Sequence, residues 1–178
     1  MQKILNLLTC AMITLCLGFT SPAMAENETY GAAGSSQLTD EQLTLDKMLS
    51  FAIQDEYLAR GEYQKIIEKF GNNRPFSNII KAEERHIAWL KPLFEKFELV
   101  LPPDRGLELA TIPATFAESL QIGAAAEVAN IAMYKRFLKQ QLPDNVREVF
   151  SHLLSASENH LAAFTRNGRG MGKGRQAQ

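Results

Sequence analysis

Hydrophobic residues recur every three to four positions in four stretches of the chain, with polar residues between them. This spacing is typical of amphipathic helices, because side chains three and four residues apart share one helix face. No stretch alternates hydrophobic and polar positions for long enough to indicate a strand. The sequence therefore predicts an all-α fold with four helices, running from about Asp40 to Phe70, Pro75 to Phe97, Thr115 to Gln141 and Pro143 to Arg166.

Local signals mark the helix ends. Gly71 follows the first helix as a C-terminal stop residue, and Thr115 with Glu118 forms a Thr-x-x-Glu capping box at the start of the third. Pro92 lies inside the second helix and is expected to kink or fray its last turns. The connection at residues 98–113 is long enough to cross the length of a bundle. We therefore expect an antiparallel four-helix bundle with one long crossover between helices 2 and 3.

Residues 1–25 are typical of a secretory signal peptide. Lys3 precedes an apolar run, and Ala23-Met24-Ala25 is a small-x-small pattern that signal peptidase cleaves. A transmembrane anchor would need a longer apolar run. A lipoprotein signal would need a small residue where Leu15 precedes Cys16. We therefore expect an exported protein, periplasmic or secreted, that is not held in a membrane after cleavage.

The rest of the chain divides into three parts by composition. The predicted helices give the central part a hydrophobic core, whereas its flanks are rich in Gly and small polar residues, and the C-terminal flank is also basic. The expected divisions are a flexible leader at residues 26–38, a bundle domain at residues 39–166 and a disordered tail at residues 167–178.

Charge and cysteine content exclude several classes of protein. The 178 residues include 19 basic and 20 acidic side chains, a net charge of −1. A chain so near neutrality has no field to hold a polyanion, so we expect no nucleic-acid partner. Both cysteines, Cys10 and Cys16, lie in the predicted signal peptide. The mature chain would then have no disulfide, cysteine nucleophile or iron–sulfur cluster.

Polar residues interrupt the apolar stripes of all four predicted helices. Glu56 in the first helix and Glu127 in the third each lie seven residues before a tyrosine. Glu83 and His86 share one face of the second helix, and His160 lies in the stripe of the fourth. Because the two halves of the chain repeat this arrangement, we interpret them as a duplicated helical hairpin. Burying three carboxylates and two imidazoles is costly unless cations compensate them.

These five residues therefore predict a metal site. Glutamate and histidine side chains from four helices are how bundles bind two metal ions. Carboxylate ligands favour iron or manganese, while two imidazoles would also suit zinc or copper. The predicted metal ligands are Glu56, Glu83, His86, Glu127 and His160.

The sequence resembles the ferritin-like superfamily, and its rubrerythrin branch in particular, over about residues 40–166. The segments that carry the resemblance are Asp55-Glu56-Tyr57-Leu58-Ala59-Arg60 with Tyr63, Glu83-x-x-His86, Glu127 with Met133-Tyr134, and His160. The segments from Phe76 to His86 and from Ser157 to Leu161 resemble an uncharacterised ferritin-like family known as domain of unknown function 2202. The resemblance implies a ferritin-like four-helix bundle. Such bundles often dimerise, so a homodimer is an expected assembly.

Two positions depart from the rubrerythrin pattern. The fourth helix carries Ser157 where that family has a glutamate that bridges two metals, and Asn130 stands at a second carboxylate position of the third helix. Glu158 lies about 100° around the helix from Ser157, so it is not expected to replace the missing ligand. One or two ions per chain are therefore expected. Asn130 is a candidate to bind a metal ligand by a hydrogen bond.

Three functions fit these residues. The first is a redox protein in which iron or manganese reacts with oxygen or peroxide, with Glu83 bridging the Glu56–His86 and Glu127–His160 pairs. Rubrerythrin-like peroxidase activity would require an external electron donor. The second is a non-enzymatic metal-binding or stress protein, and the third is a structural bundle with a relic site. Tyr63 and Tyr134 either bind the ligands or only pack, His152 is expected at the surface, and Trp89 at a packing or interface position.

Overall fold

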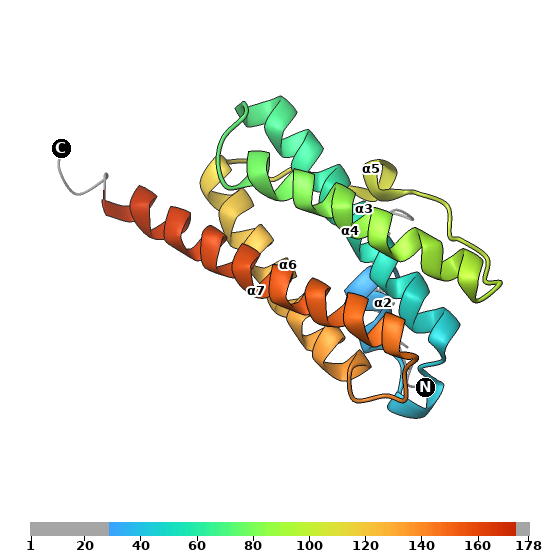
Figure 1. Cartoon of the computed structure of the whole chain (residues 1–178). Coiled ribbons are helices and arrows are strands. Elements are labelled where there is room, and N and C mark those ends of the chain that lie inside the picture. The colour runs from blue at the N-terminus through green and yellow to red at the C-terminus, as the bar shows by residue number, and fades with distance from the viewer. Residues whose placement is uncertain (1–28, 174–178) are drawn as a thin grey trace, which may run out of the picture.

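The computed structural model describes residues 29–173, and these are helical, with no strand among them (Figure 1). The all-α prediction is therefore confirmed. None of the described helices is both long and apolar enough to cross a membrane. The predicted signal peptide lies outside the described residues. The elements are α2 (Gly31–Ser36), the 3₁₀ turn η1 (Asp40–Gln42), α3 (Leu45–Phe70), α4 (Phe76–Lys96), α5 (Gly106–Leu109), α6 (Phe116–Phe137) and α7 (Asp144–Lys173).

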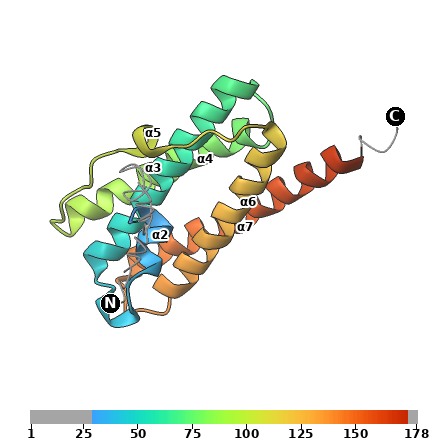
Figure 2. The ribbon, with the colours of Figure 1, turned by 180° about the vertical axis from the view of Figure 1, so that it is seen from behind.

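The four long helices form two hairpins that lie against each other. One hairpin consists of α3 and α4, and the other of α6 and α7 (Figure 1). They meet where α4 contacts α7 and α3 contacts α6. The crossover from α4 to α6 carries the short α5 along α3, as Figure 2 shows from behind.

The long helices begin and end where capping groups satisfy the backbone. Thr44 and Thr115 accept hydrogen bonds from the N–H groups of Lys47 and Glu118 at the starts of α3 and α6. Thr115 is therefore the N-cap, as predicted, while the Glu118 carboxylate accepts from the Ala114 N–H, one residue before the position that a capping box uses. Gly71 ends α3 with a φ of +88°, in the region that favours glycine.

Pro92 lies inside α4, which continues to Lys96. The 3₁₀ turn η1 and residues 43–44 precede α3, so the first helix begins five residues later than predicted.

The prediction of a flexible leader is wrong for the described part of residues 26–38. Tyr30 is buried, and α2 lies against α3 and α6. Asp55 accepts a hydrogen bond from the Ala32 N–H at 2.9 Å, and Arg136 donates one to the Ser35 carbonyl at 2.8 Å. These partners are distant in sequence, so tertiary contacts order a segment whose composition alone indicates flexibility.

The predicted tail at residues 167–178 is also wrong in part, because α7 continues to Lys173. The Asn167 side chain donates to the carbonyl of Ala163, one turn earlier, and does not end the helix. Gly168 is exposed and lowers helix propensity without preventing a helix. Residues 174–178 lie outside the described part of the chain.

A polar layer divides the hydrophobic core into two clusters. The larger cluster packs around Leu49, Leu90, Phe137 and Phe150, and the smaller around Phe76 and Phe164. On α4, α6 and α7, the glutamate or histidine of the predicted site lies between the residues of the two clusters, and on α3 Glu56 lies beside Tyr57, where the larger cluster ends. The core thus holds the site residues at one level of all four helices.

Candidate metal centre

The structure brings the five predicted ligands together in two groups of three. Glu56, Glu83 and His86 form one group, and Glu83, Glu127 and His160 form the other. In each group, one potential ligand atom per residue lies within 4.8 Å of the others. Glu83 belongs to both groups, so it lies where a carboxylate could bridge two ions.

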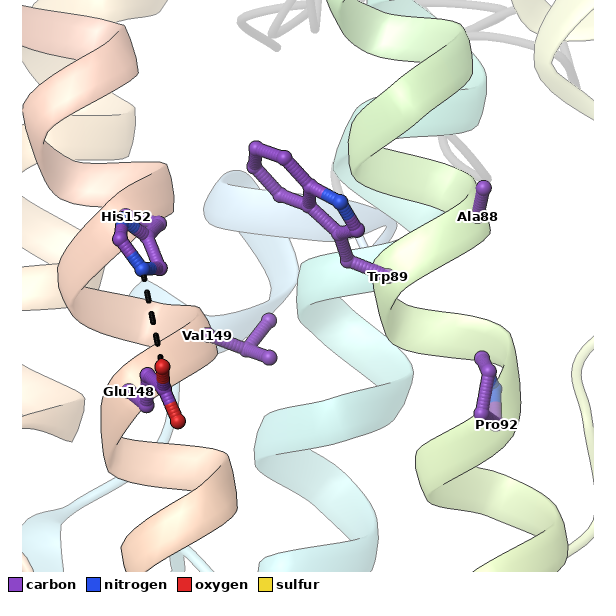
Figure 3. Close-up of a pocket in the computed structure, with 6 residues that line it drawn as sticks. All are labelled: Ala88, Trp89, Pro92, Glu148, Val149 and His152. Atoms are coloured by element: carbon purple, nitrogen blue, oxygen red, sulfur yellow. Dashed lines mark ion pairs between the residues drawn. The ribbon is translucent and has the colours of Figure 1, made fainter.

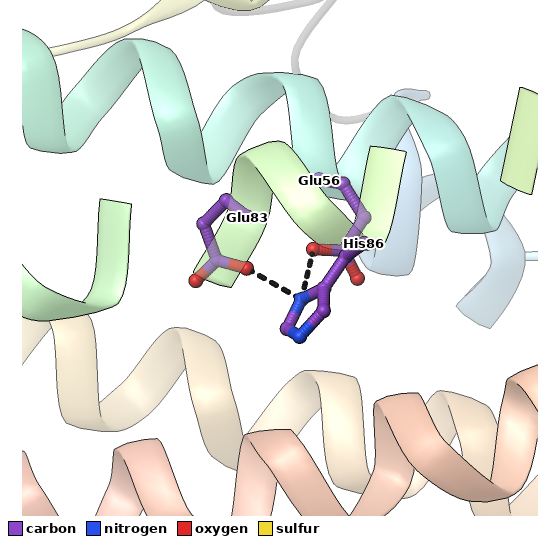
Figure 4. Close-up of side chains that lie close together, drawn as sticks. All are labelled: Glu56, Glu83 and His86. Carbon is purple, nitrogen blue, oxygen red and sulfur yellow. Dashed lines mark hydrogen bonds and ion pairs between the residues drawn. The ribbon is translucent and has the colours of Figure 1, made fainter. Parts of the chain in front are cut away.

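The first group joins α3 and α4 (Figure 4). Nδ1 of His86 lies 3.0 Å from Oε2 of Glu56 and 2.8 Å from Oε2 of Glu83. The i, i+3 spacing of Glu83 and His86 places both on the face of α4 that is turned toward Glu56. All three residues are buried.

The second group joins the two hairpins. Nδ1 of His160 on α7 lies 3.2 Å from Oε1 of Glu127 on α6 and 3.4 Å from Oε1 of Glu83 on α4. Glu83 therefore directs one oxygen toward each histidine. The imidazole rings of His86 and His160 are stacked, with centroids 5.8 Å apart. Glu127 and His160 therefore lie at one level of the α6–α7 hairpin.

Tyr63 and Tyr134 bind the predicted ligands through hydrogen bonds. The Tyr134 hydroxyl donates to Oε1 of Glu56 at 2.8 Å, and the Tyr63 hydroxyl to Oε1 of Glu127 at 3.3 Å. Each tyrosine follows one glutamate on its own helix and binds the glutamate of the other. Burial, together with the carboxylates nearby, raises both hydroxyl pKa values well above the usual range, so the hydroxyls remain protonated donors.

The buried carboxylates and imidazole of the first group shift one another's pKa values. Burial and the negative charge of Glu56 raise the pKa of the Glu83 carboxyl well above its usual range. Burial also acts to raise the pKa of Glu56, but its hydrogen bond and charge interaction with His86 outweigh this effect and lower it. Burial opposes protonation of His86, yet the two carboxylates raise its pKa to about 10. The raised pKa values favour a protonated Glu83 carboxyl and a protonated His86 imidazole beside the Glu56 carboxylate.

One carboxylate oxygen of the site has no partner. Oε2 of Glu127 is buried and accepts no hydrogen bond from the described residues. An unsatisfied buried acceptor is costly, and native structures contain few of them. A cation bound between Glu127, Glu83 and His160 would satisfy it.

The structure also places the residues that depart from the rubrerythrin pattern. Ser157 is buried one turn before His160, so it faces the core as predicted. Asn130 is buried and interacts with Asp55, whose pKa it acts to lower. Glu158 is exposed and pairs with Lys135 at 3.3 Å, which confirms that it does not replace the missing carboxylate.

Asp55 has a role beside the site that the sequence did not predict. It accepts from the Ala32 N–H and interacts with Asn130, so it joins α2 and α6 to α3. Burial raises its pKa to about 7, and the negative charge of Glu56 adds to this effect. In the sequence, only its position directly before Glu56 indicates that Asp55 lies near the site, because its partner helix α2 was not predicted.

Two further residues lie near the site. His152 is exposed, as predicted, and Trp89 is 43% exposed beside His86. Both line a pocket between α4 and α7 (Figure 3).

Comparison with known proteins gives relatives of unknown function. No protein-family model matches the chain. The uncharacterised protein MJ0754 of Methanocaldococcus jannaschii is 24% identical over 128 residues, which cover 64% of this chain and 69% of that protein. The crystal structure of the hypothetical protein MJ0754 matches with a TM-score of 0.66 at 22% identity, covering 76% of this chain and 86% of that one. This likeness shows a shared helical fold.

Proposed function

We propose that this chain is an exported, ferritin-like metal-binding protein whose four-helix bundle holds iron or manganese. The resemblance of its ligand segments to the rubrerythrin branch and the buried Glu/His cluster support this proposal. The signal-like composition of residues 1–25 supports export. Two ions are the upper limit that the donor set suggests, and zinc and copper remain competitors for it.

The position of Glu83 is the observation that carries the proposal. Its two oxygens face different histidines, at 2.8 Å from His86 and 3.4 Å from His160. In this arrangement, Glu56 and His86 would hold one ion, Glu127 and His160 the other, and Glu83 would contact both. The unpartnered Oε2 of Glu127 adds an available donor on the second side.

The residues around the ligands would orient them. The hydroxyls of Tyr134 and Tyr63 each hold one oxygen of Glu56 and Glu127, which leaves the second oxygen of each carboxylate for a cation. The apolar clusters on both sides limit the access of water. Iron or manganese in such a site supplies one-electron redox chemistry toward oxygen or peroxide.

Metal binding without turnover is the second candidate. Ser157 stands at the position of a bridging carboxylate, so the site has fewer oxygen donors than a complete two-metal centre. That difference favours weaker binding of a second ion and fits a protein that buffers a cation. The two functions are distinguished by repeated oxidation of Fe(II) or consumption of peroxide by the loaded protein.

Metal content and thermal stability of the protein test the proposal. The wild-type chain is compared with the Glu83→Ala/His86→Ala variant and with Glu84→Ala/Arg85→Ala, which changes two exposed residues on the same turn of α4. After reconstitution with Fe(II) or Mn(II), we expect one to two ions per wild-type chain and a raised melting temperature, because a ligand that binds only the folded state stabilises it. The control should retain both properties, and the E83A/H86A variant should lose them.

The number of ions bound per wild-type chain distinguishes the candidate functions. Near one ion per chain favours the binding function, and near two favours a redox centre. A wild-type chain that takes up no metal, with an unchanged melting temperature, would overturn the proposal and leave a structural bundle.

A further inference from the structure

Four aromatic rings form a continuous line from the metal centre to the surface. The rings of His160 and His86 are 5.8 Å apart between centroids, and those of His86 and Trp89 are 5.4 Å apart. The Trp89 ring lies 5.9 Å from that of His152, which is exposed on α7. The line thus begins at two predicted ligands and ends in solvent.

We propose that Trp89 is the electron relay of this site, carrying electrons to it from an external one-electron donor. This inference rests on the proposed function. With iron or manganese held beside His86, one electron would leave the donor, which would be oxidised by one unit, and the ion would be reduced by one unit. No bond forms or breaks, and the rings return to their initial state.

The chemistry of the side chain supports this role. Electron tunnelling falls steeply with distance, so rings in contact couple a donor and an acceptor better than separated ones. Indole is among the most easily oxidised protein side chains, and Trp89 is the only tryptophan in the sequence. Its position three residues after His86 places both rings on one side of α4.

The tyrosines that contact the site have phenylalanine rings as their other aromatic neighbours. Tyr63 is surrounded by Phe76 and Phe164, and Tyr134 by Phe137 and Phe150. Phenylalanine is much harder to oxidise than indole, so these rings are poor relays. Among the described aromatic contacts of the site, the contact between His86 and Trp89 joins the site to a partly exposed ring that is readily oxidised.

A pocket at the outer end of this line offers a place for the donor. It has a volume of about 450 Å³ and lies between α4 and α7. Figure 3 shows the indole reaching from α4 across the pocket toward His152. Ala88, Pro92 and Val149 make an apolar wall, and Glu148 supplies a negative charge at the rim. These features suit a planar, cationic aromatic donor.

Reduced methyl viologen, which is planar, cationic and a one-electron donor, tests the relay. The full chain is loaded with iron, oxidised in air, freed of oxygen and mixed anaerobically with the reduced viologen, whose loss of colour gives the rate of electron transfer per bound iron. We expect Trp89→Leu to slow this rate about tenfold and Trp89→Tyr to give an intermediate rate. Phe97→Leu, which changes a partly buried ring at the end of α4 outside the line, should stay within about twofold of wild type.

Iron content, melting temperature and fluorescence are measured on the same samples. Iron beside His86 should quench the Trp89 emission, whereas zinc should not, and this readout is independent of electron transfer. Equal rates in W89L and F97L, with normal iron content, would overturn the relay while leaving the proposed function intact. A wild-type chain that binds no iron would overturn the proposed function, and the relay with it.

Discussion

The hydroxyl of Tyr134 on α6 lies 2.8 Å from Oε1 of Glu56 on α3 and donates a hydrogen bond to it. The reciprocal pair, Tyr63 on α3 and Glu127 on α6, repeats this contact at 3.3 Å. The two hairpins are therefore joined at the polar layer by matching bonds. Because each bond occupies one carboxylate oxygen, it also fixes the direction of the other.

The Tyr134→Phe substitution should weaken metal binding. It leaves Oε1 of Glu56 without its donor, and loss of a partner that orients a ligand typically costs about 10- to 100-fold in metal affinity. Titration of Fe(II) or Mn(II), followed by Trp89 fluorescence, measures the change. Tyr57→Phe is the matched control, since Tyr57 is a buried tyrosine of α3 next to Glu56 whose electrostatic neighbours are Asp104 and Arg60. Equal loss of affinity in both variants would mean that the Tyr134 bond does not orient Glu56.

The Ser157→Glu substitution should destabilise the free protein and strengthen metal binding. Ser157 is buried one turn before His160, so a glutamate there adds a fourth carboxylate to the site. Without metal, we expect a loss of about 1–3 kcal/mol in the free energy of unfolding, because another polar group is buried without a partner. With metal, the added ligand should increase the number of bound ions and reverse the loss.

Calorimetric melting with and without metal measures these opposite effects. Ser155→Glu is the control, because Ser155 lies on the exposed side of the same turn of α7. If S157E lowers the melting temperature equally in the free and loaded states, Ser157 does not face the ions.

The grouping of the five candidate ligands could be predicted because local spacing determines which helix face each residue occupies. The i, i+3 spacing alone predicts that Glu83 and His86 share a helix face. The proximity of Glu127 and His160 follows from the register of the two helices in one hairpin. The contact between Glu83 and His160 depends on how the two hairpins meet, which the internal repeat and the family resemblance indicated. Only the three-dimensional structure shows that one oxygen of Glu83 faces His86 and the other faces His160.

The short helix α2 could not be predicted from local spacing. The segment from Gly31 to Ser36 contains two Gly and two Ser, which lower its helix propensity, and its partners Gln54, Asp55 and Arg136 are distant in the sequence. Its fold therefore depends on a surface that exists only after α3 and α6 have come together. The direction of Trp89 toward His152 likewise depends on a contact between α4 and α7.

The Glu62→Gln substitution should change the pH dependence of stability. Burial raises the pKa of Glu62 to about 7, although the Thr111 backbone N–H and Lys65 act in the opposite direction. The usual value for glutamate is 4.5, so between these two pH values the folded chain retains a proton that the unfolded chain loses. Stability consequently falls as the pH rises through this window and levels off above it.

Glutamine does not titrate. The free energy of unfolding of E62Q, relative to that of wild type, should therefore rise by about 1–3 kcal/mol from pH 4 to pH 8. Urea unfolding at both pH values measures the difference, with the exposed Glu84→Gln variant as control. A constant difference between E62Q and wild type across this range would show that Glu62 is ionised in the folded protein.

The Gly106→Ala substitution should destabilise the contact of the crossover with α3. A Cβ at Gly106 would lie 1.8 Å from the carbonyl oxygen of Tyr57, and this oxygen belongs to a helix backbone that cannot turn away. Because α5 must move off α3, we expect a loss of about 2 kcal/mol or more in the free energy of unfolding. Gly168→Ala is the control: its Cβ would meet nothing within 4 Å, and alanine should raise helix stability by up to about 1 kcal/mol. Urea unfolding measures both changes, and a G106A variant as stable as G168A would mean that α5 does not approach α3 this closely.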